Sequence, residues 1–240
     1  MTRPSAYSLI LMLMASACAP AESDSSADVA TSDSEVVSTP QRAPVAVPTF
    51  GKATPVDEGP RDPEFAAFRD SLLRIVGRRD TTALLAVLAP EIKSSFGGDE
   101  GIASFREHWR MSEPDTELWT ILEDVVRHGG RFASPDAFYA PYTFQALPDS
   151  LDAFEHLVVR DSGVVVRERP DSTSAALATL SFDIVRAGPY SGETAWRAIV
   201  LGEGRVGYVA GNLIRSPIDY RAGFERRKGR WLLVVLVAGD

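Results

Sequence analysis

Apolar residues in the middle of the chain recur at steps of three and four positions, which is the spacing of an amphipathic helix. The first such run consists of Phe65, Phe68, Leu72 and Ile75. Similar runs follow in "TTALLAVLA", which stops at a proline, in "EGIASFREHWR", and in "DTELWTILEDVVRH", which stops at a Gly-Gly pair. We therefore expect residues 61–158 to form a mainly helical domain.

The pattern changes to alternation of apolar and polar positions in residues 159–217. Short alternating runs are separated by glycine turns, which predicts about five short strands. Strands that are this short and closely spaced favour a small β-barrel, which removes its exposed edges by closing on itself. Residues 218–240 contain two apolar runs on either side of "RRKG" and predict a C-terminal β-hairpin. The predicted fold class is α+β: a helical domain, a small barrel and a hairpin.

Residues 163–216 resemble the bacterial SH3-like (SH3b) domain. The resemblance rests on an ordered series of residues: Val164, Val166, Arg167, Pro170, Leu177, Leu180, Val185, Trp196, Gly204, Gly207, Tyr208, Val209 and Leu213. Two positions depart from the family, because Arg169 replaces the usual Gly before the proline and Phe182 replaces a common Gly-Asp turn. Both fall in loops that line the ligand groove of the family. The resemblance therefore implies the fold more strongly than the ligand.

The ending "GRWLLVVLVAGD" faintly resembles the last strand of nuclear-transport-factor-like cones. On that interpretation, the C-terminal hairpin pairs with the helical region, and the barrel is inserted into an α+β cone. The alternative is that the hairpin packs against the barrel. The sequence leaves both arrangements open.

The first residues carry the features of an exported protein. Arg3 precedes the apolar run "AYSLILMLMA", which is too short to span a bilayer. Small residues then lead to Cys18, the one cysteine of the chain. This resembles the bacterial lipoprotein signal, in which residues 1–17 would be removed and the cysteine diacylated at sulfur. Ala15 stands where that family usually has Leu, and "ASA" also suits ordinary signal cleavage, so both kinds of processing stay open.

The lipoprotein resemblance implies a cell-envelope protein with an N-terminal lipid anchor in the membrane. Ala19, rather than Asp, follows the cysteine, which in relatives with two membranes implies the outer membrane and its periplasmic face. Residues 18–60 are rich in Ser, Asp, Ala and Pro. Such a composition buries too little apolar surface to offset the entropy of ordering, so we expect a disordered tether.

Charge and residue types exclude several classes of function. The net charge of −8 argues against nucleic acid as a partner. Thiol peptidases need a cysteine outside the signal, and only Cys18 is present. The three histidines, His108, His128 and His156, are scattered and form no metal-binding motif. No serine acyl-transfer motif occurs. We expect no catalytic residues, no metal site and no cofactor.

Paired carboxylates are the exception, because glycosidic cleavage needs only two of them at a suitable separation. The candidates are Asp99, Glu100, Glu107, Glu123 and Asp124. The alternative interpretation is that these residues are helix caps and solvated helix faces. A carboxylate-based cell-wall glycan hydrolase therefore stays as an alternative function.

Four residues of the SH3b-like segment are candidate ligand-binding residues. Trp196 and Tyr208 offer aromatic surface for a peptide or a sugar, although both could instead belong to the core. Arg167 can bind a carboxylate, and Arg169 marks the loop at the edge of the groove. The hypothesis is a non-catalytic envelope lipoprotein that binds a peptide, a peptidoglycan stem peptide or a partner protein. A purely structural envelope adaptor is a further alternative.

Overall fold

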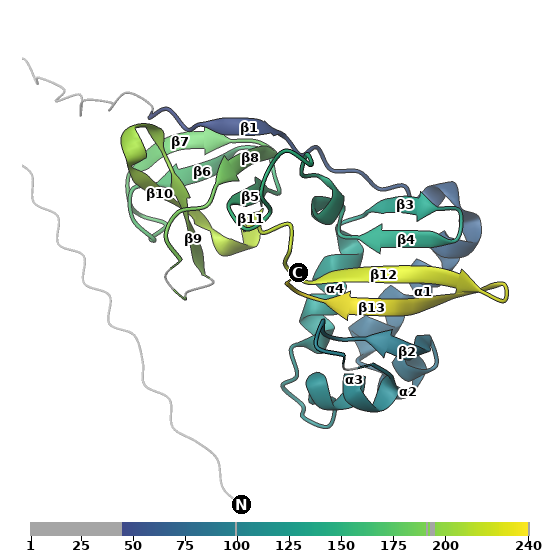
Figure 1. Cartoon of the computed structure of the whole chain (residues 1–240). Coiled ribbons are helices and arrows are strands. Elements are labelled where there is room, and N and C mark those ends of the chain that lie inside the picture. Colours follow the sequence, from purple (N-terminus) through teal and green to yellow (C-terminus); the bar gives the residue numbers. More distant parts are fainter. Residues whose placement is uncertain (1–44, 99, 191, 193–194, 240) are drawn as a thin grey trace, which may run out of the picture. The chain divides into compact units, whose positions relative to one another are not determined.

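The computed structural model describes residues 45–98, 100–190, 192 and 195–239, all of which belong to one compact unit, residues 42–240. The predicted signal, Cys18 and the first part of the predicted tether lie outside the described residues. The described part contains thirteen strands in three sheets (Figure 1).

The largest sheet has five strands, and the C-terminal strands lie at its centre. Its order is β2 (Leu88–Lys93), β13 (Arg230–Val237), β12 (Arg221–Arg227), β4 (Ala137–Ala140) and β3 (Arg131–Ser134). All neighbours are antiparallel except β13 and β2, which are parallel. The C-terminal strands therefore pair with strands from residues 61–158, and not with the SH3b-like segment.

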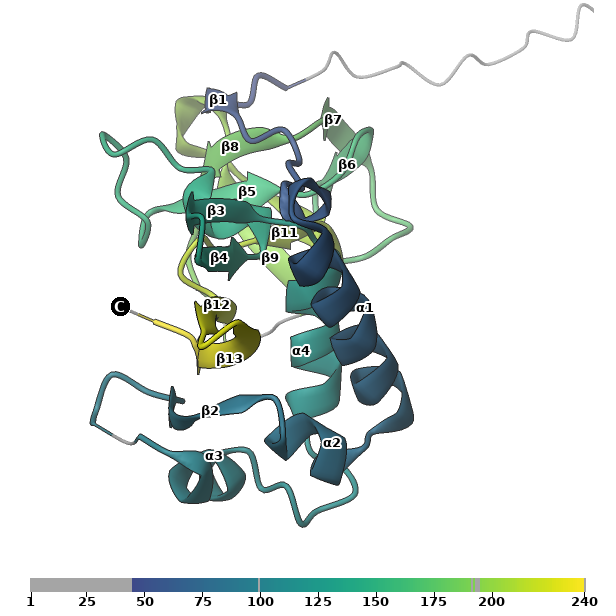
Figure 2. The ribbon, with the colours of Figure 1, turned by 90° about the vertical axis from the view of Figure 1, so that its right-hand side faces the viewer.

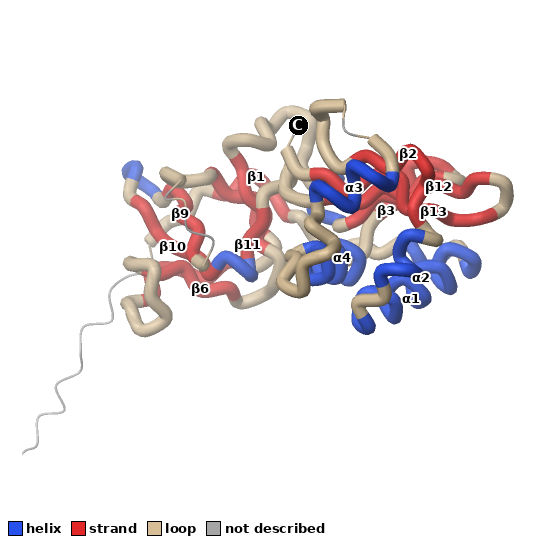
Figure 3. Tube along the Cα trace, turned by 90° about the horizontal axis from the view of Figure 1, so that it is seen from below, coloured by secondary structure: helices blue, strands red, loops and turns tan. Residues whose placement is uncertain are grey.

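Four α-helices accompany this sheet: α1 (Pro63–Arg78), α2 (Thr81–Leu85), α3 (Ile102–His108) and α4 (Leu118–Arg127). Figure 2 shows α1 and α4 side by side on one face of the sheet, and Figure 3 shows the α-helices gathered around it. Asp62 begins α1 by accepting hydrogen bonds from the backbone N–H groups of Glu64 and Phe65.

The main core lies between the helices and the sheet. Phe65 of α1 is fully buried at its centre, with ring centroids of Phe138 at 4.2 Å and of Trp231 at 4.9 Å. These rings come from α1, β4 and β13. The apolar face of the first helix is therefore buried only when the last strand of the chain packs against it.

The expected mainly helical domain is therefore wrong, because residues 61–158 supply three of the five strands of this sheet. The clearest error is the run before Pro90, which the sequence analysis assigned to one helix. The helix ends at Leu85, and β2 begins at Leu88 and runs through Pro90. This is possible because β2 is an edge strand, where a residue without an N–H group breaks no pairing on its open side.

Residues 163–216, together with β1 and β5, form two four-stranded sheets around a second core. One has the order β1 (Thr49–Lys52), β8 (Asp183–Arg186), β5 (His156–Val159) and β11 (Ile214–Arg215). The other has the order β7 (Ala176–Leu180), β6 (Val164–Arg167), β10 (Val206–Ala210) and β9 (Trp196–Val200). Short 3-10 turns occur at Gly59–Arg61, Tyr142–Gln145, Gly202–Gly204 and Gly211–Leu213.

The expected closed barrel is also wrong. The strands are shared between two sheets with open edges, and an isolated bridge between Ala187 and Ile199 connects them. The strands pair within two separate sheets, and β1, which precedes the predicted barrel in the sequence, joins one of them, which local alternation does not reveal.

Part of the predicted tether is ordered as well, because β1 pairs with β8. Val45 and Val47 pack against the second core, and Lys52 forms a 2.8 Å ion pair with the buried Asp183. Residues 45–60 therefore belong to the folded part of the chain.

A shared carboxylate connects α4 to the SH3b-like sheets. Asp124 accepts a hydrogen bond from Arg160 at 2.6 Å and a second from Arg215 of β11. Burial alone would raise the pKa of Asp124. The hydrogen bond from Arg160 and the charges of Arg160, Arg215 and His128 outweigh that effect and lower the pKa below its ordinary value.

This lowered pKa predicts how stability depends on pH. Asp124 contributes stability above the ordinary Asp pKa of about 4, and that contribution is lost as the pH falls through the lower pKa of the folded state. We expect Asp124→Asn to be less stable than the wild type at about pH 7, and the difference to shrink below about pH 4. Denaturant unfolding at several pH values measures it.

The control is Asp70→Asn, which alters an exposed carboxylate on α1 and should match the wild type throughout. A difference between Asp124→Asn and the wild type that stays constant down to about pH 3 would contradict the assignment.

Candidate functional site

Three of the four predicted ligand-binding residues lie on one face of the sheet β7-β6-β10-β9. Arg167 of β6 is directly opposite Tyr208 of β10, and Tyr208 is opposite Ala198 of β9. Trp196 lies two residues before Ala198, on the same face of its strand. The residues in between, such as Ile199 and Val209, point into the second core.

This placement bears on the two interpretations of Trp196 and Tyr208. Both side chains are half-buried, and neither belongs to the second core. Gly207 explains the close packing beneath them, because a Cβ atom there would come within 2.6 Å of Val166. Trp196 and Tyr208 therefore lie on the outer face of the sheet.

The two predicted arginines differ in how firmly they are held. Arg167 is half-buried, and its Nη1 donates to the carbonyl of Ser174 at 2.8 Å. Arg169 is exposed in the following loop, where its backbone N–H donates to Ser174 Oγ. Asp171 stabilises the same loop by accepting hydrogen bonds from the backbone and side chain of Thr173, which lower the pKa of Asp171.

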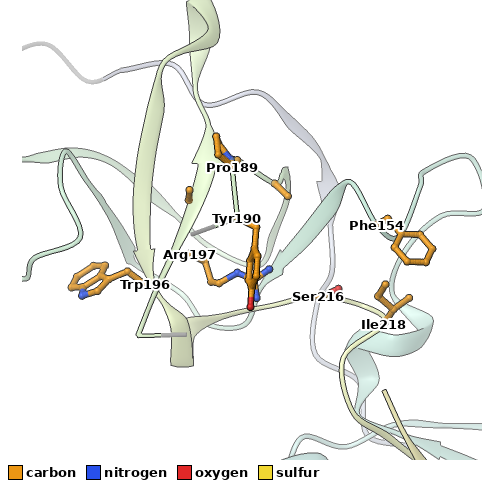
Figure 4. Close-up of a pocket in the computed structure, with 10 residues that line it drawn as sticks. Phe154, Pro189, Tyr190, Trp196, Arg197, Ser216 and Ile218 are labelled. Carbon is orange, nitrogen blue, oxygen red and sulfur yellow. The ribbon is translucent and has the colours of Figure 1, made fainter. Parts of the chain in front are cut away.

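A groove lies beside β9, and Trp196, Arg197 and Ala198 of that strand are among its lining residues. It has a volume of about 280 Å³. Figure 4 shows Tyr190 and Arg197 together, with Phe154 and Ile218 across from them and Trp196 pointing away. This agrees with the alternation along β9, which sends Trp196 and Arg197 to opposite faces.

The groove exposes large aromatic side chains, which is unusual for a folded surface. Tyr190 is 75% exposed and Phe154 is 66% exposed. The guanidinium carbon of Arg197 lies 5.8 Å from the centroid of the Tyr190 ring, within cation–π range. A ligand that covers these rings removes their apolar surface from contact with water, which is favourable. Exposed aromatic rings of this kind therefore favour ligand binding.

Arg197 supplies the charge of the groove. It is the one charged side chain among the described lining residues, and no carboxylate of the described chain pairs with it. An unpaired guanidinium beside a tyrosine ring can bind a carboxylate in two parallel hydrogen bonds. The groove therefore suits a ligand with an apolar or aromatic part and a carboxylate.

Gly188 brings the opposite wall of the groove close to β9. Its N–H donates to the carbonyl of Ala198 at 2.9 Å, and the bridge between Ala187 and Ile199 continues this contact. A Cβ atom at Gly188 would lie 2.9 Å from that of Ala198 and 3.0 Å from its carbonyl carbon. The absence of a side chain at this position is thus what lets Pro189 and Tyr190 line the groove.

The carboxylates that were candidates for catalysis are mostly in ion pairs. Glu100 pairs with Lys93 at 3.1 Å, Glu123 with Arg127 at 2.8 Å, and Asp124 with two arginines. Glu107 lies in α3, and Asp99 lies outside the described residues.

The histidines also stay apart. His108 makes an edge-to-face contact with Trp109, His128 ends α4, and His156 is buried in β5. Within the described part of the chain, no group of three or more His, Cys, Asp or Glu residues could hold a metal ion. No helix in that part is long and apolar enough to cross a membrane.

Sequence reasoning missed Phe154, Tyr190 and Arg197. The run "RAGPYSG" combines turn residues with a tyrosine, which is a signal for an exposed aromatic side chain. Nothing local indicates that Phe154, more than thirty residues earlier, faces the same groove. Comparison of the chain with protein-family models, with curated proteins and with solved structures gave no match.

Gly188 provides a test of how the groove is built. We expect Gly188→Ala to lower the free energy of unfolding by about 1–3 kcal/mol, because the added methyl group forces its segment away from β9. Gly77→Ala is the control, since nothing lies within 4 Å of a Cβ atom there. In α1 that change should stabilise the protein by about 0.5–1 kcal/mol. Urea unfolding measures both variants, and equal stabilities for Gly188→Ala and the wild type would contradict the close approach.

Proposed function

We propose that this protein is a non-catalytic binding protein of the cell envelope, and that the groove beside β9 binds a peptide with a carboxylate. The observation that carries the proposal is the combination of the exposed rings of Tyr190 and Phe154 with Arg197, which pairs with no carboxylate of the described residues. Aromatic side chains supply contact area at low entropic cost, and the guanidinium fixes the orientation of the ligand.

The envelope location rests on the lipoprotein-like start and on the resemblance of residues 163–216 to SH3b domains. In the cell envelope, the stem peptide of peptidoglycan is a suitable ligand for the groove, because it is a short peptide with free carboxylates that Arg197 can bind. A partner protein with an acidic, aromatic-rich segment would meet the same groove. The outer face with Trp196, Tyr208 and Arg167 is the other surface on which the family resemblance places a ligand.

No specific observation favours the glycan hydrolase. Two of its carboxylates, Glu100 and Glu123, form exposed ion pairs, and Asp124 is held by arginines that lower its pKa. A general acid needs a raised pKa so that it is protonated at neutral pH. Asp124 therefore suits a structural role better than an acid-catalytic one.

The groove is tested by co-sedimentation of the full chain, in detergent, with purified peptidoglycan. We expect saturable binding without released muropeptides. Arg197→Gln and Tyr190→Ala should each weaken binding about tenfold, the effect of losing one charge-assisted hydrogen bond or one well-packed aromatic contact. Phe96→Ala removes an exposed aromatic side chain elsewhere, beside Arg221, and should bind as the wild type does.

Tyr208→Ala separates the two surfaces. If Tyr208→Ala abolishes binding while Arg197→Gln leaves it intact, the ligand binds the outer face and not the groove. Release of soluble muropeptides by the wild type would overturn the non-catalytic proposal. Failure to sediment, combined with capture of a synthetic acidic peptide, would assign the groove to a partner protein.

The lipid anchor is tested separately, at Cys18. We expect Cys18→Ala to move from the membrane fraction to the soluble fraction of cells and to lose labelling by radioactive palmitate, since the thioether-linked chains supply the anchoring. A variant that remains in the membrane fraction, or a wild type that takes up no label, would refute the anchor.

A further inference from the structure

A second cavity, of about 510 Å³, lies beside α4 and is separate from the groove. Thr120, Ile121, Asp124 and His128 line it from α4 and its end. The other side is lined by Arg160, Asn212, Arg215, Asp219 and Tyr220. A volume of this size falls within the range of about 300–1,000 Å³ that is usual for small-molecule sites.

Two nearly buried arginines dominate this cavity. The side chain of Arg215 is 7% exposed and that of Arg160 is 10% exposed. They share one carboxylate, that of Asp124, which accepts a hydrogen bond from each. Asp219 is a second carboxylate in the lining, so the cavity contains two arginines and two aspartates, of which Asp124 is the one hydrogen-bonded to both arginines.

Both arginines also keep N–H donors that no group of the described residues accepts. Arg215 donates from Nη1 to Asp124 and from Nη2 to the carbonyl of Tyr220, but its buried Nε has no hydrogen-bond partner in the described chain. The contacts of Arg160 with Asp124 and His128 all involve Nη2, which leaves Nε and Nη1 unused within the same described residues. Unpaired donors on a buried charged group are costly unless a ligand or water receives them.

A purely structural role does not account for these donors. Arginines near the C-terminal end of a helix are stabilised by its dipole, and Arg160 lies close to the end of α4. That effect explains the positive charge near His128. It assigns no acceptor to the remaining donors of Arg160, and the carbonyl of Asp124 in α4 lies 2.6 Å from His128 Nδ1.

Asp219 is the group that works against an anion in this cavity. Its Oδ2 lies 4.0 Å from Arg215 Nε, and Oδ1 accepts from the backbone of Tyr220. Asp219 is 44% exposed, so water screens its charge far more than it screens the two arginines. Arg160 and Arg215 are therefore the cationic groups that an anion would meet in this cavity.

We propose that this cavity binds an oxyanion, the carboxylate or phosphate group of a small ligand, through the unused Nε and Nη1 donors of Arg160, beside the charge of Arg215. Planar guanidinium groups match the oxygen spacing of both anions. The site is independent of the groove beside β9, and neither proposal requires the other.

The test is isothermal titration of the full chain, in detergent, with inorganic phosphate in one arm and with succinate in the other. We expect saturable binding of at least one of the two anions. The anion with the higher affinity indicates whether the natural ligand offers a phosphate or a carboxylate group. Arg160→Gln should weaken binding at least about tenfold, since it removes charge-assisted donors. The absence of saturable binding in both arms would overturn the proposal.

Two further variants keep the test informative if Arg160→Gln folds poorly. Asn212→Asp places a negative charge at an exposed position of the cavity wall and should also weaken binding several-fold. Arg78→Gln makes the same change in net charge at an exposed position of α1, outside the lining of the cavity, and should bind as the wild type does. Equal affinities for Asn212→Asp and Arg78→Gln would refute the site.

A last variant fixes which side of Arg160 the anion occupies. Arg160 and His128 also line a smaller cavity of about 280 Å³, which includes Tyr142 with its buried, unpaired hydroxyl. Tyr142→Phe should retain full affinity and fold at least as well, because that hydroxyl makes no hydrogen bond in the described chain. Loss of binding in Tyr142→Phe would overturn the assignment to the larger cavity.

Discussion

The structure depends on the insertion of β12 and β13 between strands that precede them by many residues. β12 lies between β4 and β13, and β13 pairs in parallel with β2, so the five-stranded sheet is continuous only when the C-terminus is in place. Residue Ala140, at the end of β4, is directly opposite Ala222. Residues 141–220 therefore leave the sheet and return to it at neighbouring strands, which lets them form two further sheets and the second core together with β1 and the residues before it. Such long-range pairing carries a high loop-closure entropy, which the aromatic contacts of Phe65 with β4 and β13 must offset.

Local patterns predicted the parts of this fold that local forces determine. The three- and four-residue spacing located α1 and α4. Errors arose where pairing partners far along the chain decide the structure. Pro90 reads as the end of a helix, yet it lies in a strand because β13 pairs with its neighbours. The composition of Thr49–Lys52 predicts a disordered tether, yet these residues form a strand because they pair with β8.

The candidate site shows the same division. Alternation along the strands is enough to put Arg167, Tyr208 and Trp196 on one face. The groove is different, because Phe154, Tyr190 and Ile218 come from three separate loops and meet only in the folded chain. Phe182 shows how a departure from a family pattern appears in the backbone. It adopts a φ of 57°, a conformation that the glycine usual in that turn takes with less strain.

The segment from Arg215 to Tyr220 gives the two cavities a common wall. Ser216 and Ile218 line the groove, whereas Arg215 and Tyr220 line the cavity beside α4. Arg215 is also fixed from both sides, by Asp124 and by the carbonyl of Tyr220. A ligand that changes how Arg215 is held therefore acts on the same short backbone that positions Ile218. Any effect of one ligand on the affinity for the other must then be reciprocal, because the coupling free energy belongs to the pair of sites and not to either one.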